Sequence, residues 1–163
     1  MTELQAIESA RDCFLNNGYG CAETVLIVLQ QAYALENAQD SSPAMALNGG
    51  VAWSGNLCGP LSAAAMAAGQ LAAQRIGNRR TAKRIARRII AHCLDEFQAQ
   101  YGAVNCRDLI RQDIHTEEQH AVFIESGLWR TQCMSQIEFT IRRLYPLCDE
   151  QVWRQVLAGL ASH

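Results

Sequence analysis

Seven cysteines are the residues of this 163-residue chain whose type best suits redox or metal chemistry. They are Cys13, Cys21, Cys58, Cys93, Cys106, Cys133 and Cys148. No two of them lie closer than eight residues apart, so the C-x-x-C spacing of zinc ribbons, thioredoxin motifs and ferredoxin-type clusters is absent. Any site made from these thiols must therefore be assembled in three dimensions from separate elements.

The cysteine count also bears on location. An odd number of cysteines in a chain whose first residues, MTELQAIESARD, lack an apolar signal region predicts reduced thiols in the cytoplasm. No stretch of about 18 apolar residues occurs, so we expect no membrane span.

Local context separates the cysteines into groups. Three cysteines fall where a helix is expected to begin. Cys21 follows Gly-Tyr-Gly, Cys58 precedes Gly-Pro, and Cys106 follows Asn105. A helix N-terminus offers unpaired N–H groups and the positive end of the dipole, which stabilise a thiolate. Cys133 lies inside an expected helix. The other three are Cys13 and Cys93, expected to pack on apolar helix faces, and Cys148, whose role is open.

Apolar residues recur at helical spacing along the whole chain. The pattern predicts helices over residues 2–16, 21–35, 61–76, 81–100, 128–144 and 149–161, with short helices near 108–110 and 120–125. No alternation typical of strands is present. We therefore expect an all-α fold, a single compact domain over residues 1–163 with about six to seven helices.

A glycine-rich loop precedes the third predicted helix. Gly49, Gly50, Gly55 and Gly59 occur within eleven residues and permit backbone conformations closed to other residues. We expect Gly50 and Gly59 to bring backbone N–H groups close to a group bound near Cys58. Trp53 in the same loop either covers such a site or packs in the core.

Four blocks of the sequence resemble a family of helical proteins described as redox-active, whose pattern we write C…CGAxxG…C…C. Residues 14–26 (FLNNGYGCAETVL) resemble its first block, and Gly49-Gly50 with Cys58-Gly59-Pro60-Leu61 its second. Residues 97–109, which contain Cys106, resemble the third, and Cys133 the fourth. The resemblance covers about residues 5–144. Pro60 and Ala63 stand where we place Ala and the final Gly of the second block, which leaves open how closely a cofactor approaches this turn.

The resemblance implies a functional set of Cys21, Cys58, Cys106 and Cys133. The family is related to the iron–sulfur part of split-Soret-type cytochromes, which implies a cluster held by four thiolates and an electron-transfer function. Zinc held tetrahedrally, metal-free dithiol/disulfide pairs and four merely buried thiols are the alternatives. Whether the protein is an enzyme stays open.

Charge is distributed unevenly. Residues 41–94 contain no Asp or Glu and seven of the fourteen basic residues, so this segment carries +7 while the remainder carries −9. The cations of one helix recur at helical spacing and form what we call the Arg stripe: Arg79, Arg80, Lys83, Arg84, Arg87 and Arg88. A solvated surface is the simplest interpretation. The stripe could also dock an acidic redox partner or a second copy of the chain, and the overall pI of about 6.1 disfavours nucleic acid.

Overall fold

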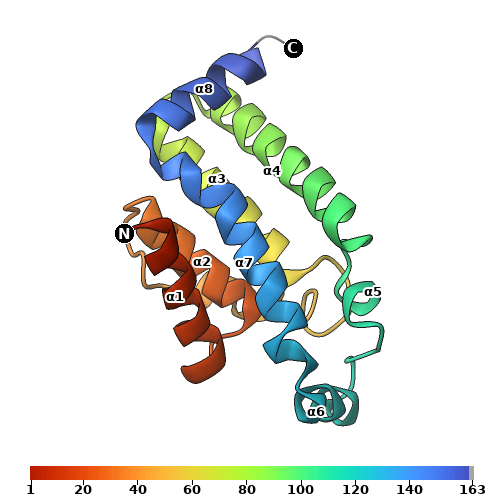
Figure 1. The fold of residues 1–163 in the computed structure, drawn as a ribbon. Coiled ribbons are helices and arrows are strands. Elements are labelled where there is room, and N and C mark those ends of the chain that lie inside the picture. The colour runs from red at the N-terminus through yellow and green to blue at the C-terminus, as the bar shows by residue number, and fades with distance from the viewer. Residues whose placement is uncertain (162–163) are drawn as a thin grey trace.

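The computed structural model describes residues 1–161 as an assembly of helices (Figure 1). They are α1 (Glu3–Arg11), α2 (Cys21–Ala32), α3 (Gly59–Arg75), α4 (Arg79–Tyr101), α5 (Cys106–Ile110), α6 (Glu117–Ser126), α7 (Gln132–Leu144) and α8 (Glu150–Ala161). Single helical turns at Asp12–Asn16, Ser42–Leu47, Leu128–Arg130 and Tyr145–Cys148 connect some of them. Among these residues β pairing is limited to one isolated bridge, between Leu57 and Asn105. The prediction of an all-α single domain is confirmed.

Helix α3 lies at the centre of the bundle and packs against α2, α4 and α7. It can do so because its inward positions are small: Ala63, Ala64, Ala67 and Ala68 are all fully buried. Helix α2 is apolar on nearly every side and is buried at Ala22 and from Thr24 to Gln30, as expected for a helix surrounded by others. The sequence of α3 thus sets how closely its neighbours approach.

The ends of several helices are defined by local signals. Thr116 caps α6 in a capping box with Gln119, as the sequence predicts. Asn78 accepts a hydrogen bond from the backbone N–H of Thr81 and caps α4. Gly102, in the left-handed conformation with φ of 78°, ends α4.

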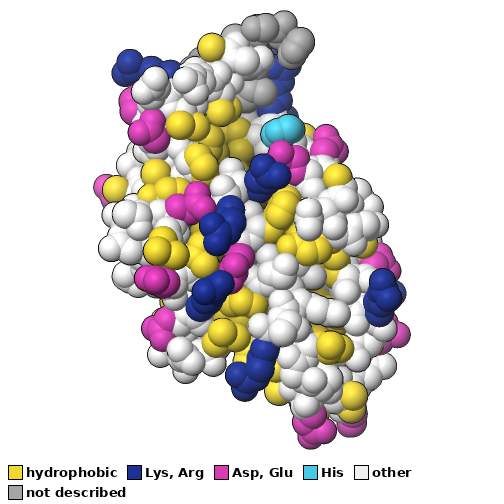
Figure 2. Space-filling model, viewed as in Figure 1, with side chains coloured by type: hydrophobic (Ala, Val, Ile, Leu, Met, Phe, Trp, Pro, Cys, Tyr) yellow, Lys and Arg dark blue, Asp and Glu magenta, His cyan; other side chains and the backbone are white. Residues whose placement is uncertain are grey.

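Ion pairs join the outer helices. Arg11 of α1 contacts Glu138 of α7 at 2.7 Å, Arg142 of α7 contacts Glu3 of α1 at 2.7 Å, and Arg143 pairs with Glu96 of α4 at 3.4 Å. Figure 2 shows cationic and anionic side chains interspersed on the face of the molecule seen there. Along residues 1–161, no helix combines the length and the apolar character that a membrane span requires.

The glycine-rich loop before α3 contains an unusual run of backbone. Five consecutive residues from Gly49 to Trp53 have positive φ, between 50° and 72°. For the non-glycine members Val51, Ala52 and Trp53, this conformation costs about 1–2 kcal/mol each. The loop closes on itself through hydrogen bonds such as Asn56 N–H to the Gly50 carbonyl at 3.1 Å. Its backbone is therefore held in a strained conformation by its surroundings.

Candidate functional site

Each of the four cysteines that the resemblance selects lies at the start of a different helix. Helix α2 begins at Cys21, Cys58 immediately precedes α3, and α5 begins at Cys106, as the sequence predicts. Cys133 was expected inside a helix, but the separate turn at Leu128–Arg130 makes it the second residue of α7. Four helix N-termini thus carry the four thiols.

The loop before α3 is joined to the start of α5 by main-chain hydrogen bonds. The N–H of Cys58 donates to the Val104 carbonyl at 2.9 Å, and the N–H of Cys106 donates to the Asn56 carbonyl at 2.7 Å. These two bonds flank the bridge between Leu57 and Asn105. Cys58 and Cys106, far apart in sequence, are therefore fixed relative to one another by backbone.

The start of α3 also lies against Cys21. A Cβ added at Gly59 would be 2.6 Å from the Cys21 sulfur, so only glycine allows this approach. Gly50 lies instead against the backbone of Asn56, where a Cβ would come within 2.4 Å of the Asn56 carbonyl oxygen. Gly59 therefore lies beside a site cysteine, whereas Gly50 allows the close backbone contact that closes the loop.

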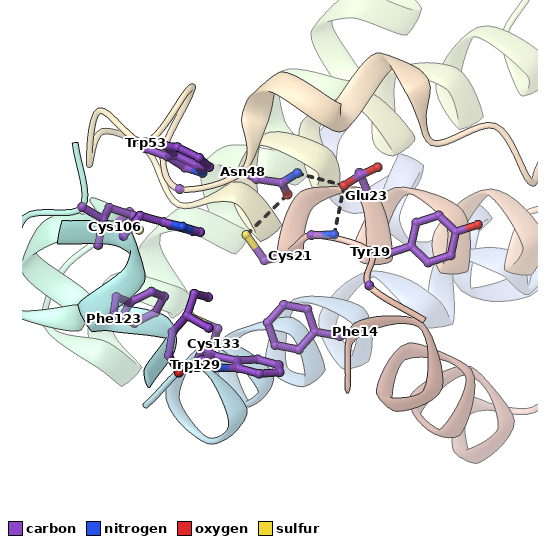
Figure 3. A pocket seen from close by; sticks show the side chains of 16 residues that line it. Phe14, Tyr19, Cys21, Glu23, Asn48, Trp53, Cys106, Phe123, Trp129 and Cys133 are labelled. Atoms are coloured by element: carbon purple, nitrogen blue, oxygen red, sulfur yellow. Dashed lines mark hydrogen bonds between the residues drawn. The ribbon is translucent and has the colours of Figure 1, made fainter. Parts of the chain in front are cut away.

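A pocket of about 390 Å³ opens among three of these cysteines (Figure 3). Cys21, Cys106 and Cys133 line it, together with the aromatic residues Phe14, Tyr19, Trp53, Phe123 and Trp129. Cys58 does not line the pocket and is only 3% exposed. Its thiol nevertheless interacts electrostatically with those of Cys21, Cys106 and Cys133. The fold therefore gathers all four predicted cysteines in one region.

Burial determines the protonation of these thiols. It raises the pKa of Cys106 to about 12 and raises the pKa of Cys58 and of Cys133 well above the ordinary value, with repulsion between the thiols adding to the effect. Burial also raises the pKa of Cys21, although N–H groups of Gly49, Ala22 and Cys21 itself act against it. The expectation that helix starts would favour thiolates is wrong in its net direction, because desolvation outweighs the N–H groups.

Two side-chain amides that the sequence pattern does not predict contact the site thiols. The Cys21 thiol donates to Asn48 Oδ1 at 3.8 Å, and Asn48 Nδ2 in turn donates to the Glu23 carboxylate at 2.9 Å. The Cys58 thiol donates to Oε1 of Gln136, a buried residue, at 3.5 Å. A signal for Gln136 existed, since it lies three residues after Cys133 and therefore on the same face of its helix. Asn48 belongs to no pattern that would have revealed it.

The remaining cysteines lie apart from the pocket lining. Cys93 is buried in a small apolar cluster with Cys58, Leu61 and Phe97, which agrees with its expected packing role. Cys13 and Cys148 are both half-buried. All seven cysteines are free thiols. Within residues 1–161, no three His, Cys, Asp or Glu side chains are placed to hold a metal ion as they stand.

The Arg stripe occupies the N-terminal half of α4, whereas the loop that leads to Cys106 and α5 follows the opposite end of this helix (Figure 1). At a rise of about 1.5 Å per residue, roughly 20 Å of helix separates Arg88 from Tyr101, next to the loop that leads to Cys106. Arg80, Lys83, Arg84 and Arg87 are exposed, and the described residues provide no salt bridge for these four. The structure therefore does not bring the predicted docking residues to the predicted redox site.

Comparison with known proteins gives one match. The model of the family described as "Putative redox-active protein (C_GCAxxG_C_C)" matches residues 19–146. Neither the curated proteins nor the solved structures contain a match to the chain. The matched range includes Cys21, Cys58, Cys106 and Cys133, and it leaves out Cys13 and Cys148.

The family's own pattern has the letters GCAxxG where we wrote CGAxxG. In this chain Gly-Cys-Ala occurs at residues 20–22, and the block at Cys58 has the order Cys-Gly. The match itself spans well over half of the chain, and the chain belongs to this redox-active family.

Proposed function

We propose that this redox-active protein transfers electrons through an iron–sulfur cluster held by Cys21, Cys58, Cys106 and Cys133. The observation that carries the proposal is the gathering of four thiols from four helix N-termini in one region, three of them lining one pocket. Thiolates are the usual ligands of iron–sulfur clusters, and the positive ends of helix dipoles favour an anionic centre.

The residue types of the site suit such a cluster, but the four thiols do not all face one point in this structure. The four thiols provide a complete donor set, and the pocket provides space between three of them. No three side chains of residues 1–161 converge on a single ion, so binding requires the thiols to turn toward the pocket. Such a cluster, when bound, would accept and release single electrons.

The raised thiol pKa values argue against a nucleophilic function of the free thiols. A buried thiol with a pKa near 12, as at Cys106, is almost entirely protonated near neutral pH and reacts slowly as a nucleophile. A bound metal deprotonates its thiol ligands outright. The backbone N–H groups of Gly49, Ala22 and Cys21 act to lower the pKa of the Cys21 thiol, and N–H groups near the sulfur ligands tune the potential of an iron–sulfur centre.

The test is reconstitution of the full chain with ferrous iron and sulfide under anaerobic conditions. We expect visible absorption, an electron paramagnetic resonance signal on reduction, and stoichiometric iron and sulfide. Replacing any one of the four cysteines by serine should lower bound iron and change the spectrum. The matched control is Cys93→Ser, because Cys93 is as buried as Cys58, both at 3% exposure, but lies outside the set.

Two results would overturn the proposal. The first is a folded protein that binds no iron after reconstitution. The second is iron binding that survives serine at all four positions. Zinc analysis of the protein as purified separates the tetrahedral zinc alternative from both.

A metal-free dithiol function is the second candidate. The observation in its favour is that all seven cysteines are free thiols and that no single-ion site is formed among residues 1–161. Mild oxidation with oxidised glutathione would then produce a reversible disulfide within the four-cysteine set, identified by peptide mass mapping. A colourless protein that forms such a bond supports this function over the cluster.

A docking role for the Arg stripe is a separate proposal. Its exposed cations suit an acidic redox protein or an acidic surface on a second copy of the chain. Sedimentation at 50 and 500 mM salt, alone and with poly-glutamate, should show association that salt weakens and that Arg84→Glu with Arg87→Glu abolishes. Equal behaviour of the variant and the natural chain would contradict this role. A cytoplasmic location stays a prediction.

A further inference from the structure

The pocket beside the cysteines has an aromatic wall that cysteine chemistry does not require. Phe14, Phe123 and Trp129 lie across the pocket from Cys21 (Figure 3). The rings of Phe14 and Trp129 meet edge to face, with centroids 5.4 Å apart. Apolar surface dominates the pocket, and its volume of about 390 Å³ is within the range typical of small-molecule sites.

Trp53 forms another part of this wall and is held there at a cost. It ends the left-handed run that begins at Gly49, and its own φ is 61°. Its ring stacks on that of His120, with centroids 4.1 Å apart and an interplanar angle of 14°. Trp53 is 36% exposed, so burial in a core does not account for a strained tryptophan at this position. Backbone strain of this kind concentrates at ligand and active sites.

The charge of the pocket restricts what can bind. Among the described residues that line it, Glu23 is the acidic one, and there is no Lys or Arg. Arg130 lies over the Trp129 ring at 4.4 Å but is not part of the lining. Nucleotides and other extended anions would therefore meet a carboxylate without a Lys or Arg side chain beside it, and burial lowers the pKa of His120, which favours its neutral form. An uncharged planar ring suits both the stacking surfaces and this electrostatic environment.

We infer that the pocket binds an uncharged, planar aromatic molecule of the quinone class, stacked against Trp53 next to Cys21 and Cys106. The aromatic part of the inference comes from the pocket walls, and the choice of a quinone rests on the proposed redox function, because quinones are redox-active members of this class. The inference concerns binding and requires no cluster to be present.

Duroquinone is the probe, because its four ring methyl groups leave no free ring position for addition of a thiol. We would titrate it into the full chain, both metal-free and after iron–sulfide reconstitution, and follow tryptophan fluorescence and heat. We expect one saturable site per chain, and at least tenfold weaker binding of the anionic anthraquinone-2-sulfonate.

Variants identify where the probe binds. Trp53→Ala should weaken binding about tenfold, the equivalent of one good aromatic stacking contact, while Trp53→Phe should retain most of the affinity. Ile124→Ala should weaken it about fourfold, since Ile124 lines the pocket and loses buried methyl surface. Ile124 is 44% exposed, so this variant should fold even if Trp53→Ala does not. Val122→Ala is the control on the same helix, outside the lining.

The outcomes separate this inference from the proposed function. Absence of saturable binding, equal binding of the sulfonate, or unchanged affinity in both Trp53→Ala and Ile124→Ala would overturn the inference and leave the cluster untouched. Binding to the metal-free chain combined with failure of iron–sulfide reconstitution would sustain the inference and overturn the cluster.

Discussion

A methyl group added at Gly59 would collide with the sulfur of Cys21. The added Cβ would lie 2.6 Å from Cys21 Sγ, 3.2 Å from Ala22 Cβ and 3.3 Å from Ala22 N. Relieving the first contact requires the cysteine, which has a single side-chain torsion, to rotate away from Asn48, its partner at 3.8 Å. Gly59→Ala therefore tests whether the sulfur is held against the start of α3.

The magnitude follows from two opposed effects. Overpacking of a well-packed region typically costs 1–3 kcal/mol, whereas alanine in place of glycine in a helix gains up to about 1 kcal/mol. We expect Gly59→Ala to lower the free energy of unfolding by about 1–2 kcal/mol. Gly69→Ala is the matched control on the same helix, because nothing lies within 4 Å of its added Cβ; it should be stabilising by up to about 1 kcal/mol.

Urea denaturation of the reduced, metal-free protein measures both changes. The decisive arm repeats Gly59→Ala in a Cys21→Ala background, where the sulfur is gone and the remaining contacts at 3.2 and 3.3 Å need only small shifts. There the substitution should change stability by less than about 0.5 kcal/mol, which gives a coupling of roughly 1–2 kcal/mol. If Gly59→Ala is as stabilising as Gly69→Ala, or costs the same with and without the sulfur, the close approach of Cys21 to α3 is refuted.

Three further predictions concern the same region. Asn48→Ala should lower the free energy of unfolding by about 1–3 kcal/mol in urea denaturation, because Ala22 N–H loses its acceptor at 2.9 Å and Glu23 loses a donor; an unchanged midpoint would contradict these bonds. Ala52→Gly should raise the melting temperature through a net gain of up to about 1 kcal/mol, because relief of about 1–2 kcal/mol of strain at a φ of 50° exceeds the entropy that glycine adds to the unfolded chain. A lower melting temperature would show that the run is not strained. Iodoacetamide should alkylate Cys106 of the metal-free protein more slowly than it alkylates free cysteine at pH 8, because burial raises the pKa of Cys106 to about 12 and little thiolate is present below that pH. The alkylation rate should therefore keep rising about tenfold per pH unit toward pH 11. Mass spectrometry of the Cys106 peptide measures this rate, and a rate that levels off near pH 9 would contradict the raised pKa.

The sequence predicts the helices well because their signals are local. Thr116 with Gln119 marks the start of α6, and the small residues of α3 indicate its central position. The start of α7 was predicted too early, since the turn at Leu128–Arg130 continues the apolar spacing of the helix that follows it. A short turn and the first turn of a helix produce nearly the same pattern of apolar residues.

The chemistry of the site depends on packing that no local pattern records. Helix starts at Cys21 and Cys106 are visible in the sequence, but the net direction of their pKa shifts depends on burial by distant segments. The two glycines of the left-handed run are visible in the sequence as positions that tolerate positive φ, whereas nothing in the sequence indicates positive φ at Ala52 and Trp53. The amide of Gln136 reaches Cys58 only because α7 packs against α3.

The main-chain bonds between the loop before α3 and the start of α5 have a consequence for how the protein matures. Cys58 and Cys106 meet through a contact of high sequence separation, which forms only once the intervening helices α3 and α4 have folded back on one another. The largest apolar core, built from α1, α2, α3, α4, α7 and α8, excludes Cys58, Cys106 and Cys133. A zinc finger differs, because there the metal supplies the folding energy, whereas this main core contains none of those three thiols. We therefore expect any group that occupies the site to enter an already folded chain, through the mouth of the pocket.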